Sequence, residues 1–238
     1  DPFWSKHVDL VRNAIIPYQW EAMNDRIPDA ESSHCLENFE IAAGRKTGEF
    51  YGAVFQDTDV AKWLEAVGFS LACYPDEALE KTADEVIDLI AEAQCEDGYI
   101  NTYYTIKEPG KRWTDLCEGH ELYTAGHLIE AAVAYYEGTG KKKFLDCVSK
   151  FADLICDTFG TEEGKIHGYP ESCASIGLAL FGLRMAQITG ESQYIDVAER
   201  ALYNTVLAGI ALDGKSFFYV NPLEVWPPAC MEGTSKKH

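Results

Sequence analysis

The segment Glu171-Ser172-Cys173 contains the residue types best suited to hold a metal ion. A carboxylate oxygen and a thiolate sulfur are both zinc ligands. Side chains two positions apart share a face of an extended segment but diverge on a helix. The pair can therefore converge on one ion only where an extended segment enters a helix, which Pro170 favours because it biases the residue before it away from helical backbone. From residue types alone, a structural cysteine near a helix start is the more common outcome.

Two histidines and a polar cluster form a second group of candidates. His120 and His127 are seven residues apart, so on one helix they lie on the same face about two turns apart. An inward-facing histidine is more often a hydrogen-bonded core residue than a catalyst, and neither has a nearby serine or cysteine that would indicate a triad. Gln56 is a candidate pocket residue, whereas Asp57 is better placed as the N-cap of a helix that begins near Val60.

The elements that must position these residues are helices. Apolar residues recur at spacings of three and four, which predicts amphipathic helices joined by short turns. The predicted helices cover residues 8–23, 60–72, 78–93, 122–136, 144–158, 175–188 and 194–208. Residues 217–220 combine aromatic and β-branched side chains after an Asp-Gly pair, which predicts a short strand.

A long connection, residues 94–117, interrupts the helical pattern. Long structured loops on a helical scaffold often carry function. Tyr99, Tyr103 and Tyr104 in this loop either stack on a bound ligand or pack the loop against the scaffold, and the sequence leaves both readings open.

An internal repeat relates two of the predicted hairpins. The run 129–140 matches the run 180–190, and both end in Thr-Gly. The two glycines, Gly140 and Gly190, are 50 residues apart. A helical hairpin that recurs at a fixed period is typical of a stacked array or a closed ring of hairpins.

Further motifs follow one another along nearly the whole chain. They are Phe3-Trp4, Ile16-Pro-Tyr-Gln-Trp20, Val54-Phe-Gln-Asp-Thr-Asp59, Trp63-Leu-Glu65, Gly119-His-Glu-Leu-Tyr-Thr-Ala-Gly-His127, Glu171-Ser-Cys-Ala-Ser-Ile-Gly-Leu178, Glu199-Arg-Ala-Leu-Tyr-Asn-Thr205 and the run 212–224. In this order they resemble glycoside hydrolase family 127, the β-L-arabinofuranosidases. The resemblance implies an all-α fold of the (α/α)6-barrel type, in which six helical hairpins close into a ring, with a short β element near the C-terminus.

The predicted helices supply only about four hairpins of such a ring. We therefore expect one incomplete helical toroid, a single domain over residues 1–238, with apolar edges exposed where hairpins are missing. A homodimer is one way to cover these edges.

The sequence departs from the family in two places. In the family, a long run of helices separates the part that resembles residues 166–170 from the part that resembles residues 171–173. In this sequence the two parts are adjacent, at the 170/171 junction. We therefore expect a deletion of the segment that carries the family's general acid/base glutamate. The sequence also contains no Cys-x-Cys-Cys motif, which in the family supplies the cysteine nucleophile and the remaining zinc ligands. Cys230, in a setting that resembles the segment before that motif, is a poor substitute.

The resemblance also implies roles for individual residues. The zinc ligands would be Glu171 and Cys173, and the sugar contacts would be His120, Tyr219, Gln56 and His167. The family's mechanism is a retaining double displacement in which a zinc-bound cysteine thiolate attacks the anomeric carbon, in place of the usual carboxylate pair. Neither the nucleophile nor the acid/base glutamate carries over to this sequence, and two ligands do not make a stable zinc site.

Composition restricts the class of protein and its compartment. A chain of 238 residues that is 47% hydrophobic and 12% aromatic is expected to fold around a sizeable core. A net charge of −19 opposes a nucleic acid or anionic membrane as partner. The eight cysteines mostly occupy apolar helical positions, which indicates free thiols and a reducing, cytoplasmic compartment. Neither a transmembrane stretch nor a signal peptide is expected.

The leading hypothesis is a zinc-dependent glycoside hydrolase that releases β-L-arabinofuranose from plant-derived glycans or glycoconjugates, represented by a partial sequence. One alternative is another (α/α)6 sugar-active enzyme, such as an epimerase or an unsaturated glucuronyl hydrolase. Glu171 and Cys173 argue against it, because neither reaction needs a thiolate–zinc pair. The other alternative is a non-catalytic helical-repeat remnant that retains a sugar-binding cleft.

Overall fold

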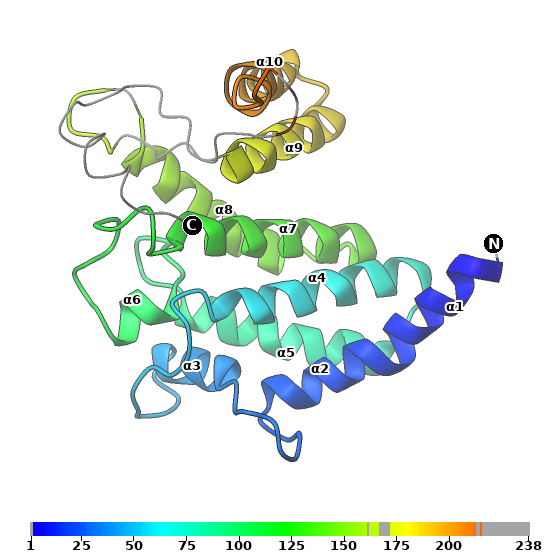
Figure 1. Cartoon of the computed structure of the whole chain (residues 1–238). Coiled ribbons are helices and arrows are strands. Elements are labelled where there is room, and N and C mark those ends of the chain that lie inside the picture. Colours follow the sequence, from blue (N-terminus) through cyan, green and yellow to red (C-terminus); the bar gives the residue numbers. More distant parts are fainter. Residues whose placement is uncertain (1, 161, 167–171, 213–214, 216–238) are drawn as a thin grey trace. The chain divides into compact units, whose positions relative to one another are not determined.

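The chain folds into helices over the part that the structure describes. The computed structural model describes residues 2–160, 162–166, 172–212 and 215 (Figure 1). Besides the helices, these residues contain one isolated bridge, between Phe159 and Ile166. The predicted strand at 217–220 lies outside the described residues.

The chain divides into two compact units, Asp1–His167 and Gly168–His238. The first contains α1 (Pro2–Leu10), the π-helix η1 (Val11–Ile15), α2 (Ile16–Met23), α3 (Cys35–Ala42), α4 (Asp57–Cys73), α5 (Glu77–Ala93), α6 (Thr102–Ile106), α7 (Glu121–Thr139) and α8 (Lys143–Thr158). The second contains α9 (Ser172–Thr189), α10 (Ser192–Ala201) and the π-helix η2 (Leu202–Leu207). All seven predicted helices are confirmed, and α3 and α6 were not predicted.

The long helix predicted at the N-terminus has a π-helical turn in its middle. Pro17 follows this turn and has no N–H with which to continue the helical ladder. The backbone N–H of Ile16 donates instead to the carbonyl of Val11, five residues back. The wider turn keeps α1 and α2 in one continuous run.

Two hairpins form the centre of the first unit. The helices α4 and α5 make one hairpin and α7 and α8 the next, with α4 packed along α7 and α5 against α8 (Figure 1). The preceding helices extend both layers, since α2 contacts α4 and α3 contacts α5. The core between the layers includes the fully buried side chains of Trp63, Tyr99, Tyr135, Phe144 and Phe151.

Glycines let α4 and α7 touch through their backbones. A Cβ added at Gly68 would lie 2.6 Å from the carbonyl carbon of Ala134 and 2.7 Å from the backbone nitrogen of Tyr135. A Cβ at Gly138 would in turn overlap the carbonyl oxygen of Gly68. Because Gly68 and Gly138 have no side chains, the backbones of α4 and α7 approach each other to direct contact.

The repeat recognised in the sequence is also a repeat of hydrogen bonds. Gly140 ends α7 and Gly190 follows α9, and both adopt φ of 73°. The Thr139 hydroxyl donates to the carbonyl of Tyr135 at 2.7 Å, and the Thr189 hydroxyl donates to the carbonyl of Met185 at 2.8 Å. In both copies the threonine hydroxyl also accepts the backbone N–H two residues on, at 3.2 Å.

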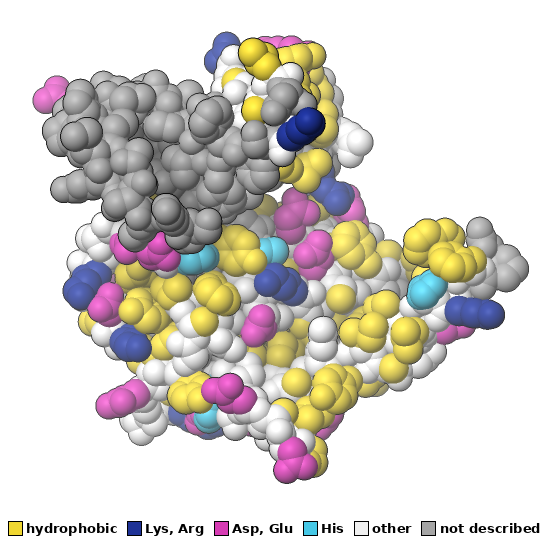
Figure 2. Space-filling model, viewed as in Figure 1, with side chains coloured by type: hydrophobic (Ala, Val, Ile, Leu, Met, Phe, Trp, Pro, Cys, Tyr) yellow, Lys and Arg dark blue, Asp and Glu magenta, His cyan; other side chains and the backbone are white. Residues whose placement is uncertain are grey.

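Apolar side chains are exposed in both units. In the first unit the helix α1 projects with Phe3 62% and Trp4 64% exposed (Figure 2). In the second unit the exposed apolar side chains include Ile176, Leu178, Leu180, Phe181, Leu183, Ile195, Val197, Leu202, Tyr203 and Leu207. Among the described helices none is both long enough and apolar enough to span a bilayer.

The expectation that Asp57 caps α4 is wrong. The N-cap position is Gln56, and no side chain caps the helix. The buried carboxylate of Asp57 accepts instead from the backbone N–H of Thr102 at 2.7 Å and from the Thr102 hydroxyl at 2.5 Å. Asp57 therefore binds the long loop at the start of α6 and does not cap the N-terminus of its own helix.

The contact between α4 and α7 can be tested with a pair of glycine substitutions. Gly68→Ala should lower the free energy of unfolding by about 1–3 kcal/mol, because rigid backbone has to move to admit the methyl group. Gly126→Ala is the matched control on α7, since its Cβ would meet no atom within 4 Å. Alanine there should leave stability unchanged or raise it by up to about 1 kcal/mol through helix propensity. Urea unfolding of both variants measures these changes in the free energy of unfolding. Equal changes in the two variants would contradict the close packing of α4 against α7 at Gly68.

The burial of Asp57 predicts an unusual pH dependence of stability. Burial raises its pKa from 3.8 to about 6, so the folded chain binds this proton more tightly than the unfolded chain. The stabilisation from protonation is complete below about pH 4 and is lost as the pH rises through 6. In Asp57→Asn the amide oxygen can accept from the Thr102 N–H while its NH2 group donates to the Thr102 hydroxyl. Relative to this variant, the wild-type chain should lose on the order of 2–3 kcal/mol between about pH 4 and pH 7 in urea unfolding. Parallel pH profiles would refute the assignment.

Candidate functional site

The candidate site lies where the N-terminal ends of α4 and α7 meet. His120 immediately precedes α7 and adopts a left-handed φ of 52°. Its imidazole packs against Phe55, with ring centroids 5.1 Å apart, and against Tyr123 at 5.7 Å. Tyr123 in turn lies edge-on to His127 at 4.6 Å. We call Phe55, His120, Tyr123 and His127 the aromatic row; Phe55 and Tyr123 are 41% and 46% exposed.

A hydrogen bond to the backbone fixes the tautomer of His120. Its Nδ1 lies 2.6 Å from the carbonyl oxygen of Glu118. Because a carbonyl oxygen only accepts, Nδ1 carries the proton and donates. In the neutral imidazole Nε2 then has a free lone pair, so His120 offers a hydrogen-bond acceptor to a hydroxyl group.

Lys62 gives the aromatic row a positive neighbour. Its ammonium lies 5.6 Å from the centre of the Tyr123 ring. Burial and the charge of Lys62 both lower the pKa of His127, in that order of importance, which keeps that imidazole neutral near pH 7. The row thus combines apolar ring faces, two imidazoles and a neighbouring cation.

Gln56 lies beside the row with its amide group already bound within the fold. Its Nε2 donates to the Ser33 hydroxyl at 3.1 Å and to Asp59 at 3.2 Å, and its Oε1 accepts from the backbone of Ala53 at 3.1 Å. Gln56 therefore holds the segment before α4 in place, and its predicted sugar contact stays a prediction.

The loop tyrosines mainly pack the long loop against the scaffold. Tyr99 and Tyr104 are buried, and Tyr99 lies edge-on to Phe151 at 5.4 Å. Tyr103 is half-buried and packs edge-on against Phe50 at 5.1 Å. Of the two readings left open by the sequence, burial supports packing for Tyr99 and Tyr104.

Sequence reasoning missed Glu121, a buried carboxylate that adjoins His120. It accepts hydrogen bonds from the Tyr99 hydroxyl and from the backbone N–H of Trp113, the latter at 2.7 Å. Burial raises the pKa of Glu121, although these hydrogen bonds oppose the rise. The only signal in the sequence was its position at a helix start, directly after a candidate histidine. That position does not indicate that the carboxylate binds the long loop, because its partners in the loop lie several residues away.

Much of the predicted zinc and sugar site lies outside the described residues. Glu171, His167, Tyr219 and Cys230 are all in this category. Cys173 is the second residue of α9, which begins at Ser172, three residues earlier than predicted. The structure therefore brings together only His120, Gln56 and their neighbours from the predicted set.

A second group with metal-ligand chemistry lies around the start of α3. The ligand atoms of Asp25, His34 and Glu37 are all within 4.8 Å of one another. The His34 Nδ1 is 2.6 Å from Glu37, Lys46 lies 3.7 Å from Glu37, and Asp25 accepts backbone N–H groups from Ser33 and His34. The carboxylates of Asp25 and Glu37 are thus already bound by hydrogen-bond donors and a cation of the protein itself.

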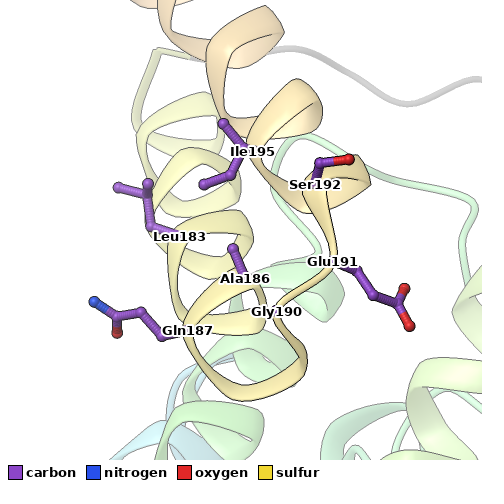
Figure 3. A pocket seen from close by; sticks show the side chains of 7 residues that line it. All are labelled: Leu183, Ala186, Gln187, Gly190, Glu191, Ser192 and Ile195. Atoms are coloured by element: carbon purple, nitrogen blue, oxygen red, sulfur yellow. The ribbon is translucent and has the colours of Figure 1, made fainter.

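A hollow in the second unit lies between the C-terminal part of α9 and the start of α10 (Figure 3). Its lining is Leu183, Ala186, Gln187, Gly190, Glu191, Ser192 and Ile195. It has no aromatic ring or imidazole, and the side chain of Glu191 points away from the hollow (Figure 3). The aromatic row therefore remains the better candidate for binding a sugar.

The chain is similar to known proteins of one family. The catalytic-domain model of the GH127 β-L-arabinofuranosidases matches the chain in two stretches, residues 1–172 and 165–238, which meet at the predicted junction. A curated non-reducing end β-L-arabinofuranosidase from Bifidobacterium longum subsp. longum is 43% identical over 217 residues, covering 83% of this chain and 32% of that protein.

Two solved structures show the same fold. A GH127 β-L-arabinofuranosidase from Geobacillus stearothermophilus T6 is 38% identical with a TM-score of 0.70, covering 96% of this chain and 58% of the other. A second GH127 β-arabinofuranosidase is 26% identical with a TM-score of 0.64, covering 94% and 55%. The chain thus spans 32% of the curated relative and less than two thirds of either structure.

These matches confirm the predicted fold class, an all-α, (α/α)6-like arrangement of hairpins that is incomplete in this chain. The family model matches sequence in both units, and the curated relative is similar over most of the chain. The chain belongs to the GH127 β-L-arabinofuranosidase family.

Proposed function

We propose that this chain carries the arabinofuranose-binding part of a glycoside hydrolase that releases β-L-arabinofuranose from plant-derived glycans. The observation that carries the proposal is the aromatic row at the ends of α4 and α7, in a chain 43% identical to a β-L-arabinofuranosidase. Exposed ring faces suit the C–H faces of a sugar, and buried or half-buried polar groups fix its orientation.

His120 is the proposed acceptor for a sugar hydroxyl. The hydrogen bond from Nδ1 to Glu118 leaves Nε2 free to accept, and Phe55 and Tyr123 hold the ring from two sides. By family resemblance, Gln56, His167 and Tyr219 complete the contacts to the sugar.

Zinc is the proposed cofactor, and the residues of this chain fit only part of its site. Glu171 and Cys173 would hold the ion together with ligands that this sequence does not contain, since it has no Cys-x-Cys-Cys motif. When bound, zinc keeps a cysteine as its nucleophilic thiolate. The family's nucleophile and acid/base glutamate are absent from this sequence, so no step of the reaction is assigned to its residues.

The second candidate function is a sugar-binding protein without hydrolytic activity. The aromatic row is compatible with both functions, because binding a sugar there requires none of the groups that react in hydrolysis. We also propose a reducing, cytoplasmic location, because Cys35, Cys73, Cys95, Cys147 and Cys156, all in the described part of the chain, form no disulfide.

The sugar site can be tested by binding of methyl β-L-arabinofuranoside to the 238-residue chain, followed by NMR. His120→Ala should weaken binding at least about tenfold, because a directed acceptor and a ring contact are both lost. His7→Ala is the control, since His7 is an exposed histidine on α1. Equal affinities of wild type and His120→Ala would refute the site.

The cofactor proposal predicts a negative result for this sequence. After incubation with zinc and desalting, a chain of 26.5 kDa should retain much less than one zinc per molecule and should not hydrolyse a chromogenic β-L-arabinofuranoside. Intact-mass measurement of the same sample verifies the chain. Stoichiometric zinc or measurable turnover would show that the site is complete without further segments.

A further inference from the structure

Glu121 connects the long loop to the helix that carries the aromatic row. It is the first residue of α7 and only 3% exposed. One carboxylate oxygen accepts from the Tyr99 hydroxyl, and the other accepts from the backbone N–H of Trp113 at 2.7 Å. Both oxygens therefore bind groups of the loop that leads to His120.

The loop between these contacts has a backbone that needs support. Trp113 and His120 both adopt left-handed conformations, with φ of 62° and 52°. Such conformations cost about 1–3 kcal/mol each in residues with bulky side chains and persist only where the surroundings enforce them. The Trp113 ring is enclosed by Tyr99 at 5.3 Å and Phe159 at 5.2 Å, so side-chain packing and the bond to Glu121 act on the same residue.

A short turn transmits this support to His120. The carboxylate of Asp115 accepts from the backbone of Glu118 at 2.9 Å, and the carbonyl of Asp115 accepts from Gly119 at 3.0 Å. The turn thereby fixes the Glu118 carbonyl, which accepts from the His120 Nδ1. Glu121 thus fixes Trp113, the chain leads from Trp113 into this turn two residues later, and the turn fixes the carbonyl that binds the imidazole.

We propose that Glu121 is a positioning residue for His120: by accepting the Trp113 N–H, it holds the segment 113–120 so that His120 stays in the Nδ1–H tautomer with Nε2 free to accept a hydroxyl. The part of this inference that concerns sugar affinity rests on the proposed function. The part that concerns the tautomer does not.

Two substitutions show whether Glu121 acts at Trp113 as a hydrogen-bond acceptor or through its negative charge. The Trp113 N–H can only donate, so it needs an oxygen, whereas the Tyr99 hydroxyl can donate or accept. In Glu121→Gln the amide oxygen can face Trp113 and the NH2 group can donate to Tyr99. In Glu121→Leu a side chain of similar size offers no acceptor, and the Trp113 N–H is left unpaired. Glutamine should therefore rescue the function that leucine removes.

The experiment measures the His120 ring by 15N NMR and the affinity for methyl β-L-arabinofuranoside in the same samples of the full chain. Wild type and Glu121→Gln should show a protonated Nδ1 and an unprotonated Nε2, with affinities within about twofold of each other. Glu121→Leu should show exchange between the two tautomers and an affinity at least about tenfold weaker, because the acceptor is no longer fixed.

Tyr99→Phe is the control for loss of stability. It removes the other hydrogen bond of the same carboxylate but leaves the Trp113 bond intact, so it should lower the unfolding midpoint without changing the His120 tautomer. A tautomer that survives in Glu121→Leu, or that changes equally in Tyr99→Phe or Glu121→Gln, would overturn the inference.

A measurement on the wild-type chain covers the case in which Glu121→Leu fails to fold. The Trp113 amide should be strongly protected from hydrogen exchange, since it donates to a buried carboxylate, and exchange at the rate of an exposed loop amide would overturn the inference. If wild type shows the predicted tautomer but binds no arabinofuranoside, the proposed function fails while the positioning role stands. If wild type binds the sugar and Glu121→Leu binds it equally well, the positioning role fails while the proposed function stands.

Discussion

The backbone contact between α4 and α7 at Gly68 and Gly138 determines where the candidate site can form. Both helices start at the same end of the first unit, and their closest approach lies several turns further along. With that distance fixed, the residues that precede each helix meet at one place, and the Phe55 and His120 rings come within 5.1 Å. A side chain at either glycine would separate the helices and, with them, the two halves of the aromatic row.

Buried carboxylates then attach the long loop to these two helices. Asp57 in α4 binds Thr102, and Glu121 in α7 binds Tyr99 and Trp113. Each carboxylate lies in the first turn of its helix, where the positive end of the helix dipole offsets part of the cost of burying a negative charge. Hydrogen bonds from the loop offset more of it, so the loop and the helix starts stabilise each other.

The helices could be predicted from the sequence because apolar periodicity and turn residues are local signals. The predicted helices 60–72 and 78–93 leave a short turn between them, and Asp76 in that turn caps α5 with its side chain, as aspartate commonly does. The repeat ending at Gly140 and Gly190 was equally local, and the same hydrogen bonds recur in both copies.

The parts that could not be predicted depend on contacts between distant residues. Asp57 looked like a cap because its type and position fit one, but its partner Thr102 is 45 residues away. Glu121 carried no local sign of its contact with Trp113, and the first residue of the short helix α6, Thr102, is held by the distant Asp57. His120 was selected by resemblance, and only the carbonyl of Glu118 shows which of its nitrogens is free.

The repeated end of the helices α7 and α9 also bears on how such a fold can arise and change. The two hairpins that begin with α7 and α9 each carry their own Thr-Gly stop signal, with hydrogen bonds between residues close in sequence. Local contacts of this kind form early and do not depend on neighbouring hairpins. Gene duplication can therefore add a hairpin, and recombination can remove several, without disturbing the ends of those that remain. A ring built from such units tolerates changes in the number of its members more readily than a sheet, whose strands each require the next.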